Sequence, residues 1–180
     1  MDLASIQEAA QRIAPHAHVT PLLTCSSLDA LSGRQLFFKC ELFQKVGAFK
    51  FRGACNAVGK LLDEEAARGV VTHSSGNHAQ ALALAARMRG IPAYIVMPRN
   101  APTVKVDAVR SYSGEITFCE PTLEARESTA REIMERTGAT FIHPFNNPNV
   151  IAGQGTMALE ILDQAAALGV TLDAIIGTPA

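Results

Sequence analysis

From residue 69 onward, short apolar runs alternate with longer stretches whose apolar positions recur at helical spacing. Apolar runs of roughly four to eight residues bounded by Gly or Pro are typical of buried strands, and a period of about 3.6 residues is typical of amphipathic helices. The pattern predicts strands over 69–73, 93–97, 115–119, 139–143 and 173–177, and helices over 77–89, 103–112, 123–137 and 149–168. This alternation predicts an α/β fold of parallel sheets flanked by helices.

The first 65 residues follow a less regular pattern. It predicts a helix over 5–14, an extended segment from Pro21, a short helix over 27–31, a strand over 35–41 and a helix over 50–65. The strand and helix alternation alone would also allow a flavodoxin-like or nucleotide-binding domain. The chain has no G-x-G-x-x-G or Walker-type loop, so its motifs do not favour that class.

Composition narrows the classes of function. With 18% charged residues and a net charge of −1, the chain offers no electrostatic basis for binding nucleic acid or a membrane surface. No apolar stretch approaches the ~20 residues of a membrane span, and Asp2 and Glu8 argue against a signal or transit peptide. The four cysteines lie far apart, with no C-x-x-C pair and no His at metal-binding spacing. We therefore expect reduced thiols, no metal site and a cytoplasmic protein.

The first candidate for chemistry is Lys50, which lies between Phe49 and Phe51 at a predicted strand-to-helix transition. A lysine amine forms a Schiff base with an aldehyde cofactor when apolar surroundings favour its neutral form. The same Phe-Lys-Phe pattern is also that of an ordinary amphipathic lysine, whose stem covers apolar surface while its charge stays in water.

The second candidate is the turn from Ser74 to His78, between the strand predicted over 69–73 and the helix predicted over 77–89. Ligands of α/β sheets bind where strands end and helices begin, because free backbone N–H groups and the helix dipole favour anions there. Ser74, Ser75, Asn77 and His78 add side-chain donors at that place. In the competing interpretation, a Ser or Asn of this turn only caps the helix.

Together the two motifs resemble those of the fold-type II pyridoxal-phosphate (PLP) enzymes, which are tryptophan synthase β-like, and specifically the serine racemase and serine/threonine dehydratase family. The stretches 36–45, 90–96 and 151–156 share that resemblance, which runs from about Val19 to Ile176. It implies that 67–146 forms a small mobile domain. Segments 1–66 and 147–180 then form the N-terminal part of a large PLP-binding domain, with the cofactor between the two domains.

The resemblance implies a role for each cofactor-binding residue. Lys50 would hold pyridoxal 5'-phosphate as a Schiff base and would remove or return the α-proton of the substrate. Phe49 would pack near the cofactor ring, and Asn77 would hydrogen-bond the ring oxygen.

The resemblance also implies a substrate site for a small amino acid. Ser74, Ser75, Asn77 and His78 would bind the substrate carboxylate, and Ser75 would act as the second acid and base on the face opposite Lys50. Ser75 favours serine racemase activity, while dehydration of L-serine or threonine to a keto acid and ammonia, or of threo-3-hydroxyaspartate, remains open. Arg126 matches an arginine that reaches the substrate when the domains close, or it belongs to a solvated charged helix face.

The sequence ends at 173–180, where the family continues into a glycine-rich loop around the cofactor phosphate. The resemblance places the family's divalent-cation site in the half beyond this point, and it implies a homodimer for the full-length enzymes. We therefore expect a fold truncated after about half of the family length. A catalytically inactive product that acts as a partner of the full-length enzyme is an alternative. Gly153 and Gly155 would either approach the cofactor or permit close helix packing.

Overall fold

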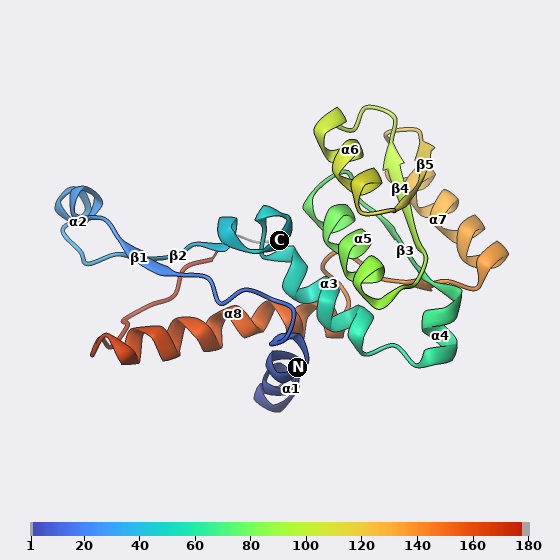
Figure 1. Ribbon diagram of the computed structural model, residues 1–180. Helices are drawn as coiled ribbons and strands as arrows, with labels where there is room; N and C mark the ends of the chain where they lie inside the picture. Colours follow the sequence, from blue (N-terminus) through green and yellow to red (C-terminus); the bar gives the residue numbers. More distant parts are fainter. Residues whose placement is uncertain (1, 178–180) are drawn as a thin grey trace.

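A computed structural model describes residues 2–177, and Figure 1 shows a compact sheet with its helices beside a more extended part. The extended part contains α1 (Leu3–Ile13), β1 (Leu22–Thr24), α2 (Ser26–Ser32), β2 (Phe37–Lys39), the 3-10 turns η1 (Glu41–Phe43) and η2 (Lys45–Gly47), α3 (Lys50–Gly59) and α8 (Pro148–Ala167). The compact part contains α4 (Asp63–Arg68), β3 (Val70–His73), α5 (Asn77–Arg89), β4 (Ala93–Pro98), α6 (Thr103–Ser111), β5 (Glu115–Cys119), α7 (Leu123–Thr137) and β6 (Thr140–Phe141).

The sheet has the strand order β5-β4-β3-β6, and every neighbouring pair is parallel. Helices α5 and α6 cover one face, and α7 covers the other (Figure 1). Because successive strand residues point to opposite faces, Val70 packs in the core that contains Leu82, while Val71 packs in the core that contains Ile133. The parallel α/β sheet predicted from the sequence is confirmed.

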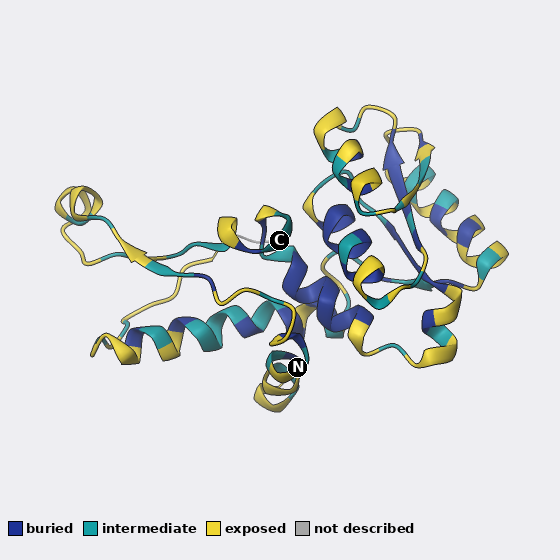
Figure 2. Ribbon diagram, in the orientation of Figure 1, coloured by how far each residue is buried: buried dark blue, intermediate teal, exposed yellow. Residues whose placement is uncertain are grey.

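Helices α3 and α8 cross at close range in the extended part, where α3 is almost wholly buried (Figure 2). A Cβ atom on Gly153 would come within 2.5 Å of the Arg52 carbonyl oxygen, and one on Gly53 would also meet α8. A Cβ atom on Gly155 would come within 2.9 Å of Ile6 in α1. Gly153 and Gly155 therefore permit close helix packing, the second of the two roles considered for them.

Three sequence-based boundaries need correction. The helix predicted over 50–65 ends at Gly59, and α4 begins anew at Asp63, because the Glu65 carboxylate accepts the Leu62 N–H over 2.9 Å and caps a second helix. The strand predicted over 35–41 shortens to β2, which pairs antiparallel with β1. The strand predicted over 173–177 is absent, because its backbone pairs with no strand within residues 2–177.

The sheet and helices α5, α6 and α7 lie between residues 70 and 141, inside the span 67–146 for which the family resemblance implies a small domain. The mobility of that domain stays a prediction, and the last three residues of the segment 147–180 lie outside the described residues. Among residues 2–177, no helix is long and apolar enough to cross a bilayer. In the same part of the chain, no three His, Cys, Asp or Glu side chains group in a way that could hold a metal ion.

Candidate functional site

Lys50 is the first residue of α3, and it lines a large cavity together with Phe49. Its Nζ donates a hydrogen bond to the Pro144 carbonyl oxygen over 3.2 Å and lies 5.1 Å from the centroid of the Phe49 ring. Burial lowers the pKa of Lys50 from its ordinary value, which favours the neutral and nucleophilic amine. The side chain is half-buried, so it does not behave as an ordinary surface lysine.

The cavity beside Lys50 has a volume of about 1110 Å³. Small-molecule sites usually occupy about 300–1,000 Å³, so the space suffices for a cofactor together with a small substrate. Its walls come from the β2 region, one side of α8, the loop at Pro144 and the segment 170–177. Apolar side chains in the wall include Leu22, Phe37, Phe38, Val150, Met157 and Ile161.

One polar wall residue, Gln154 of α8, was not singled out by the sequence. Its Oε1 accepts a hydrogen bond from the Gly53 N–H over 3.3 Å, while its buried Nε2 has no hydrogen-bond acceptor within residues 2–177. A buried donor without an acceptor costs free energy, and an oxygen atom of a ligand would remove that cost. The only sequence signal for Gln154 is its place in the stretch 151–156, which carries part of the family resemblance.

The turn after β3 leaves the start of α5 uncapped. The Ser74 N–H donates to the Val96 carbonyl oxygen over 3.0 Å, and Ser74 Oγ accepts from the Gly76 N–H over 3.3 Å. Gly76 is the N-cap residue, and no side chain caps the helix. The side chain of Ser75 makes no hydrogen bond with any described residue. The interpretation that Ser or Asn merely caps this helix is therefore wrong, and its first N–H groups lack a side-chain acceptor.

His78 is the second residue of α5 and is 2% exposed, and its Nε2 lies 3.2 Å from the Ile142 carbonyl oxygen. Burial lowers the pKa of His78 to about 4, and the nearby Lys50 ammonium acts in the same direction. The imidazole is therefore neutral at pH 7 and is held in the core. The contribution of this residue to a carboxylate site would come from its backbone N–H.

Asn77 is the first residue of α5, and its side chain is exposed. Its Oδ1 accepts a hydrogen bond from Lys105 Nζ over 2.7 Å. Lys105 lies on α6 and was not among the sequence candidates, because a contact across 28 residues has no local sequence signal.

Arg126 lies in the first turn of α7, where its N–H donates to the Thr122 carbonyl oxygen over 3.2 Å. Its Nε is buried and has no hydrogen-bond partner in residues 2–177. Helix α7, which carries Arg126, packs against β3, the strand that ends just before Ser74. Within residues 2–177 Arg126 joins no ion pair of a solvated helix face.

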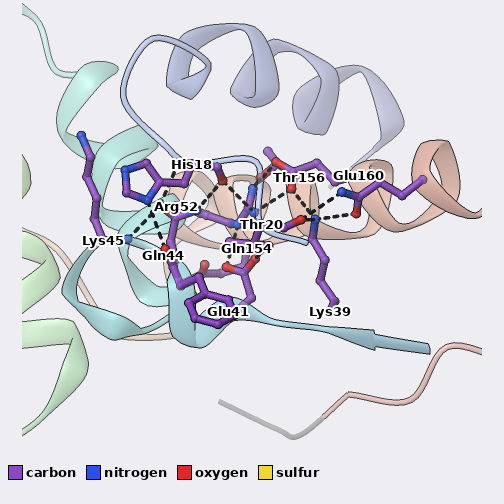
Figure 3. Close-up of polar contacts among 12 residues, drawn as sticks. His18, Thr20, Lys39, Glu41, Gln44, Lys45, Arg52, Gln154, Thr156 and Glu160 are labelled. Carbon is purple, nitrogen blue, oxygen red and sulfur yellow. Dashed lines mark hydrogen bonds and ion pairs between the residues drawn. The ribbon is translucent and has the colours of Figure 1, made fainter. Parts of the chain in front are cut away.

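A buried ion network holds the start of α3 (Figure 3). The Arg52 side chain is 0% exposed and donates to Glu41 over 2.8 Å and to Glu160 over 2.6 Å. Lys39 donates to the same Glu160 over 2.6 Å. Burial by itself would lower the pKa of Arg52, but the hydrogen bonds with Glu41 and Glu160 raise that pKa above its ordinary value. The network joins β2, η1 and α8 to the helix that begins with Lys50, and none of its residues is a candidate from the sequence.

Comparisons with known proteins agree with this architecture. A family described as "Pyridoxal-phosphate dependent enzyme" matches residues 13–178. The chain is 60% identical over 163 residues to a serine racemase of Oryza sativa subsp. indica, which covers 91% of this chain and 48% of that protein. It is 56% identical over 156 residues to a beta-hydroxyaspartate dehydratase of Paracoccus denitrificans (strain Pd 1222), covering 87% of this chain and 50% of that protein.

The solved structure of maize serine racemase superposes with a TM-score of 0.91 at 55% sequence identity. That superposition covers 92% of this chain and 50% of the maize chain. The chain thus spans about half the length of the curated relatives it matches. The fold class predicted from the sequence, that of a fold-type II PLP enzyme matched over about half of its length, is confirmed. The chain belongs to the family of pyridoxal-phosphate dependent enzymes.

Proposed function

We propose that this chain supplies the lysine-bearing half of a site that racemises serine and also eliminates water from serine or threonine. The observation that carries the proposal is Lys50, a half-buried amine with a lowered pKa at the wall of a cavity of about 1110 Å³. The names of two similar proteins, serine racemase and beta-hydroxyaspartate dehydratase, support this reaction class.

The described residues fit pyridoxal phosphate. Lys50 offers an amine to the aldehyde, Phe49 offers an apolar ring beside it, and Gln154 Nε2 offers a buried donor that lacks an acceptor. The cavity also exceeds the volume of a usual small-molecule site. In this proposal Asn77 contributes its Nδ2 group as a donor to the cofactor ring oxygen.

Bound pyridoxal phosphate would supply an electron sink that makes the substrate Cα–H bond acidic. The task of the protein is then to orient that bond and to move one proton. Lys50 Nζ accepts the Cα proton, and the Pro144 carbonyl oxygen holds the amine in place through the hydrogen bond of 3.2 Å. Desolvation keeps a fraction of the amine neutral, as a base requires.

Ser75 decides between the two outcomes. For racemisation, Ser75 Oγ–H gives a proton to Cα on the face opposite Lys50, while Lys50 keeps the proton that it removed. Exchange with solvent then returns a proton to Ser75 Oγ and removes the extra proton from Lys50 Nζ. For elimination, the substrate β-hydroxyl leaves as water with a proton from the site, and hydrolysis releases a keto acid and ammonia. Ser75 Oγ makes no hydrogen bond with any of residues 2–177, so no described residue competes for this hydroxyl.

The substrate carboxylate would bind at the start of α5. The free N–H groups there and the positive end of the helix dipole attract an anion. In the proposal Ser74 and Ser75 supply hydroxyl donors, Asn77 and His78 supply backbone N–H groups, and Arg126 approaches when the two parts close.

Beta-hydroxyaspartate is a second candidate substrate, favoured by the identity of 56% with a dehydratase of that name. The test compares the chain loaded with pyridoxal phosphate, its Ser75→Ala variant and its Lys50→Ala variant on L-serine and on threo-3-hydroxyaspartate. Removal of an acid or base typically slows a reaction by about 10²–10⁴-fold. Ser75→Ala should lose D-serine formation by about that factor and keep keto acid release, while Lys50→Ala should lose both. Equal D-serine formation by Ser75→Ala and the unaltered chain would overturn the role of Ser75.

A competing proposal is that the chain is inactive and acts as a partner of a longer enzyme. It is favoured by the large open cavity and by Ile175 and Ile176 in its wall, which are 51% and 95% exposed. The test adds the Lys50→Ala chain to an active full-length serine racemase. A change in activity at stoichiometric amounts would support the partner role, and unchanged activity would count against it.

The assembly and location of the protein also remain proposals. We propose a homodimer, which analytical ultracentrifugation tests by the mass of the particle in solution. We also propose a cytoplasmic location. All four cysteines are free, which suits a reducing compartment.

A further inference from the structure

The contact between Lys105 and Asn77 joins two helices on the same face of the sheet. Lys105 Nζ donates to Asn77 Oδ1 over 2.7 Å, and this is the one hydrogen bond of the Asn77 side chain within residues 2–177. The two side chains can meet because α6 packs against α5. The Lys105 backbone is fixed in the first turn of α6, where its N–H donates to the Pro102 carbonyl oxygen over 2.9 Å. Val106, the next residue, is 6% exposed and anchors that turn in the core.

The chemistry of the two groups determines which end of the amide faces α6. An ammonium group has three donors and no acceptor, whereas an asparagine amide has an accepting oxygen at one end and a donating nitrogen at the other. Lys105 can therefore bond only to Oδ1. The Nδ2 group is left for an acceptor elsewhere. A serine, threonine or glutamine at position 105 would bond to either end and would not select between them.

The position of Asn77 makes the orientation of its amide relevant to cofactor binding. Asn77 begins α5, next to the uncapped turn at Ser75. In the proposed function Asn77 donates to the cofactor ring oxygen. The contact with Lys105 occupies Oδ1 and leaves Nδ2 as the free end of the amide for that role.

We propose that Lys105 is a positioning residue, which holds the Asn77 amide so that Nδ2, and not Oδ1, meets the cofactor ring oxygen. This inference rests on the proposed function of the Lys50 site. A simpler role would be that the Lys105 hydrogen bond only joins α6 to α5 without any effect on ligand binding. The two roles differ in what happens to cofactor affinity when the helices stay folded.

The test compares three variants of the 180-residue chain and uses a fourth, Asn77→Ser, for signal assignment. Lys105→Met removes the ammonium and keeps the length of the side chain, while Lys105→Arg keeps a donor-only cation. Lys60→Met is the control, because Lys60 is an exposed lysine at the end of α3 whose side chain makes no hydrogen bond with a described residue. The first readout is the pair of Nδ2–H signals of Asn77 in ¹⁵N-labelled protein without cofactor, assigned by their loss in Asn77→Ser.

The second readout is pyridoxal phosphate affinity, measured as the visible absorbance that depends on Lys50. Lys105→Met should shift the Asn77 Nδ2–H signals and weaken cofactor affinity by roughly 3- to 10-fold, the effect of one net hydrogen bond. Lys105→Arg should stay near the unaltered chain in both readouts, and Lys60→Met should change neither.

Two results would overturn the inference while leaving the proposed function intact. One is an unchanged pair of Asn77 signals in Lys105→Met. The other is a shifted pair with the cofactor affinity of the Lys60→Met control, which would leave Lys105 with the joining role alone. A chain whose cofactor absorbance does not depend on Lys50 would instead overturn the proposed function and the cofactor step of the inference together, even if the apo signals showed the Lys105 contact.

Discussion

Replacing Arg52 with methionine should destabilise the fold strongly, because Arg52 is the shared cation of a buried network. It donates to Glu41 over 2.8 Å and to Glu160 over 2.6 Å, and its side chain is 0% exposed. Methionine fills much of the volume but leaves two carboxylates, 11% and 21% exposed, without this partner. Removing one member of a buried ion pair costs about 3–5 kcal/mol. The partial exposure of both carboxylates places the expected loss near the lower end, at about 3 kcal/mol.

Urea unfolding at pH 7, followed by circular dichroism, measures this loss as a change in the free energy of unfolding. Arg99→Met is the control, because Arg99 and Glu120 form a pair over 3.2 Å with side chains 67% and 69% exposed. Exposed pairs contribute about 0–1 kcal/mol. Glu160→Gln is a milder test that keeps the Arg52–Glu41 pair and should cost less than Arg52→Met. The reasoning is refuted if Arg52→Met loses no more stability than Arg99→Met.

Three further predictions address packing, pH dependence and chemistry. Gly153→Ala should cost about 1–3 kcal/mol in urea unfolding, because its Cβ would lie within 2.5 Å of the Arg52 carbonyl oxygen, whereas Gly177→Ala meets no atom within 4 Å and should be near neutral. Burial lowers the pKa of His78 to about 4 from 6.5, so the unfolded chain takes up this proton first as the pH falls. The free energy of unfolding should therefore be unaffected by His78 above about pH 6.5 and should fall as the pH drops toward 4. The total loss is up to about 3 kcal/mol, since each pKa unit corresponds to about 1.4 kcal/mol. His78→Gln should flatten that decline in unfolding free energy, and an equally steep decline would contradict it. Ser75→Ala should abolish D-serine formation in a chiral product assay while keto acid release persists.

The parallel sheet could be predicted because its strands have a local sequence signal. Val70 and Val71 form part of an apolar run bounded by glycine, and the run that ends at Pro98 is bounded by proline. Such runs are buried on both faces whichever strands they join. The prediction of a strand over 173–177 was wrong because a local apolar signal is not enough. An apolar run forms a strand only when another backbone pairs with it, and within residues 2–177 none does.

The candidate site shows the same division between local and distant signals. Lys50 and the turn at Ser75 stand in short motifs, so the sequence alone could single them out as candidates. The contact of Lys105 with Asn77 and that of Arg52 with Glu160 join residues 28 and 108 positions apart, and they emerge only from the packing of whole helices. An arginine inside a helix that is otherwise buried was the one local sign of the ion network, since such a charge needs partners.

The most direct test of the central claim is the visible absorbance of the purified 180-residue chain after addition of pyridoxal phosphate and dialysis. The Lys50→Ala chain, treated in the same way, is the control. The account predicts a band that survives dialysis in the unaltered chain and is absent from the control, because the half-buried amine with its lowered pKa reacts with the aldehyde. A chain that retains no band, or one that Lys50→Ala retains equally, would contradict the claim that Lys50 is the cofactor-binding residue.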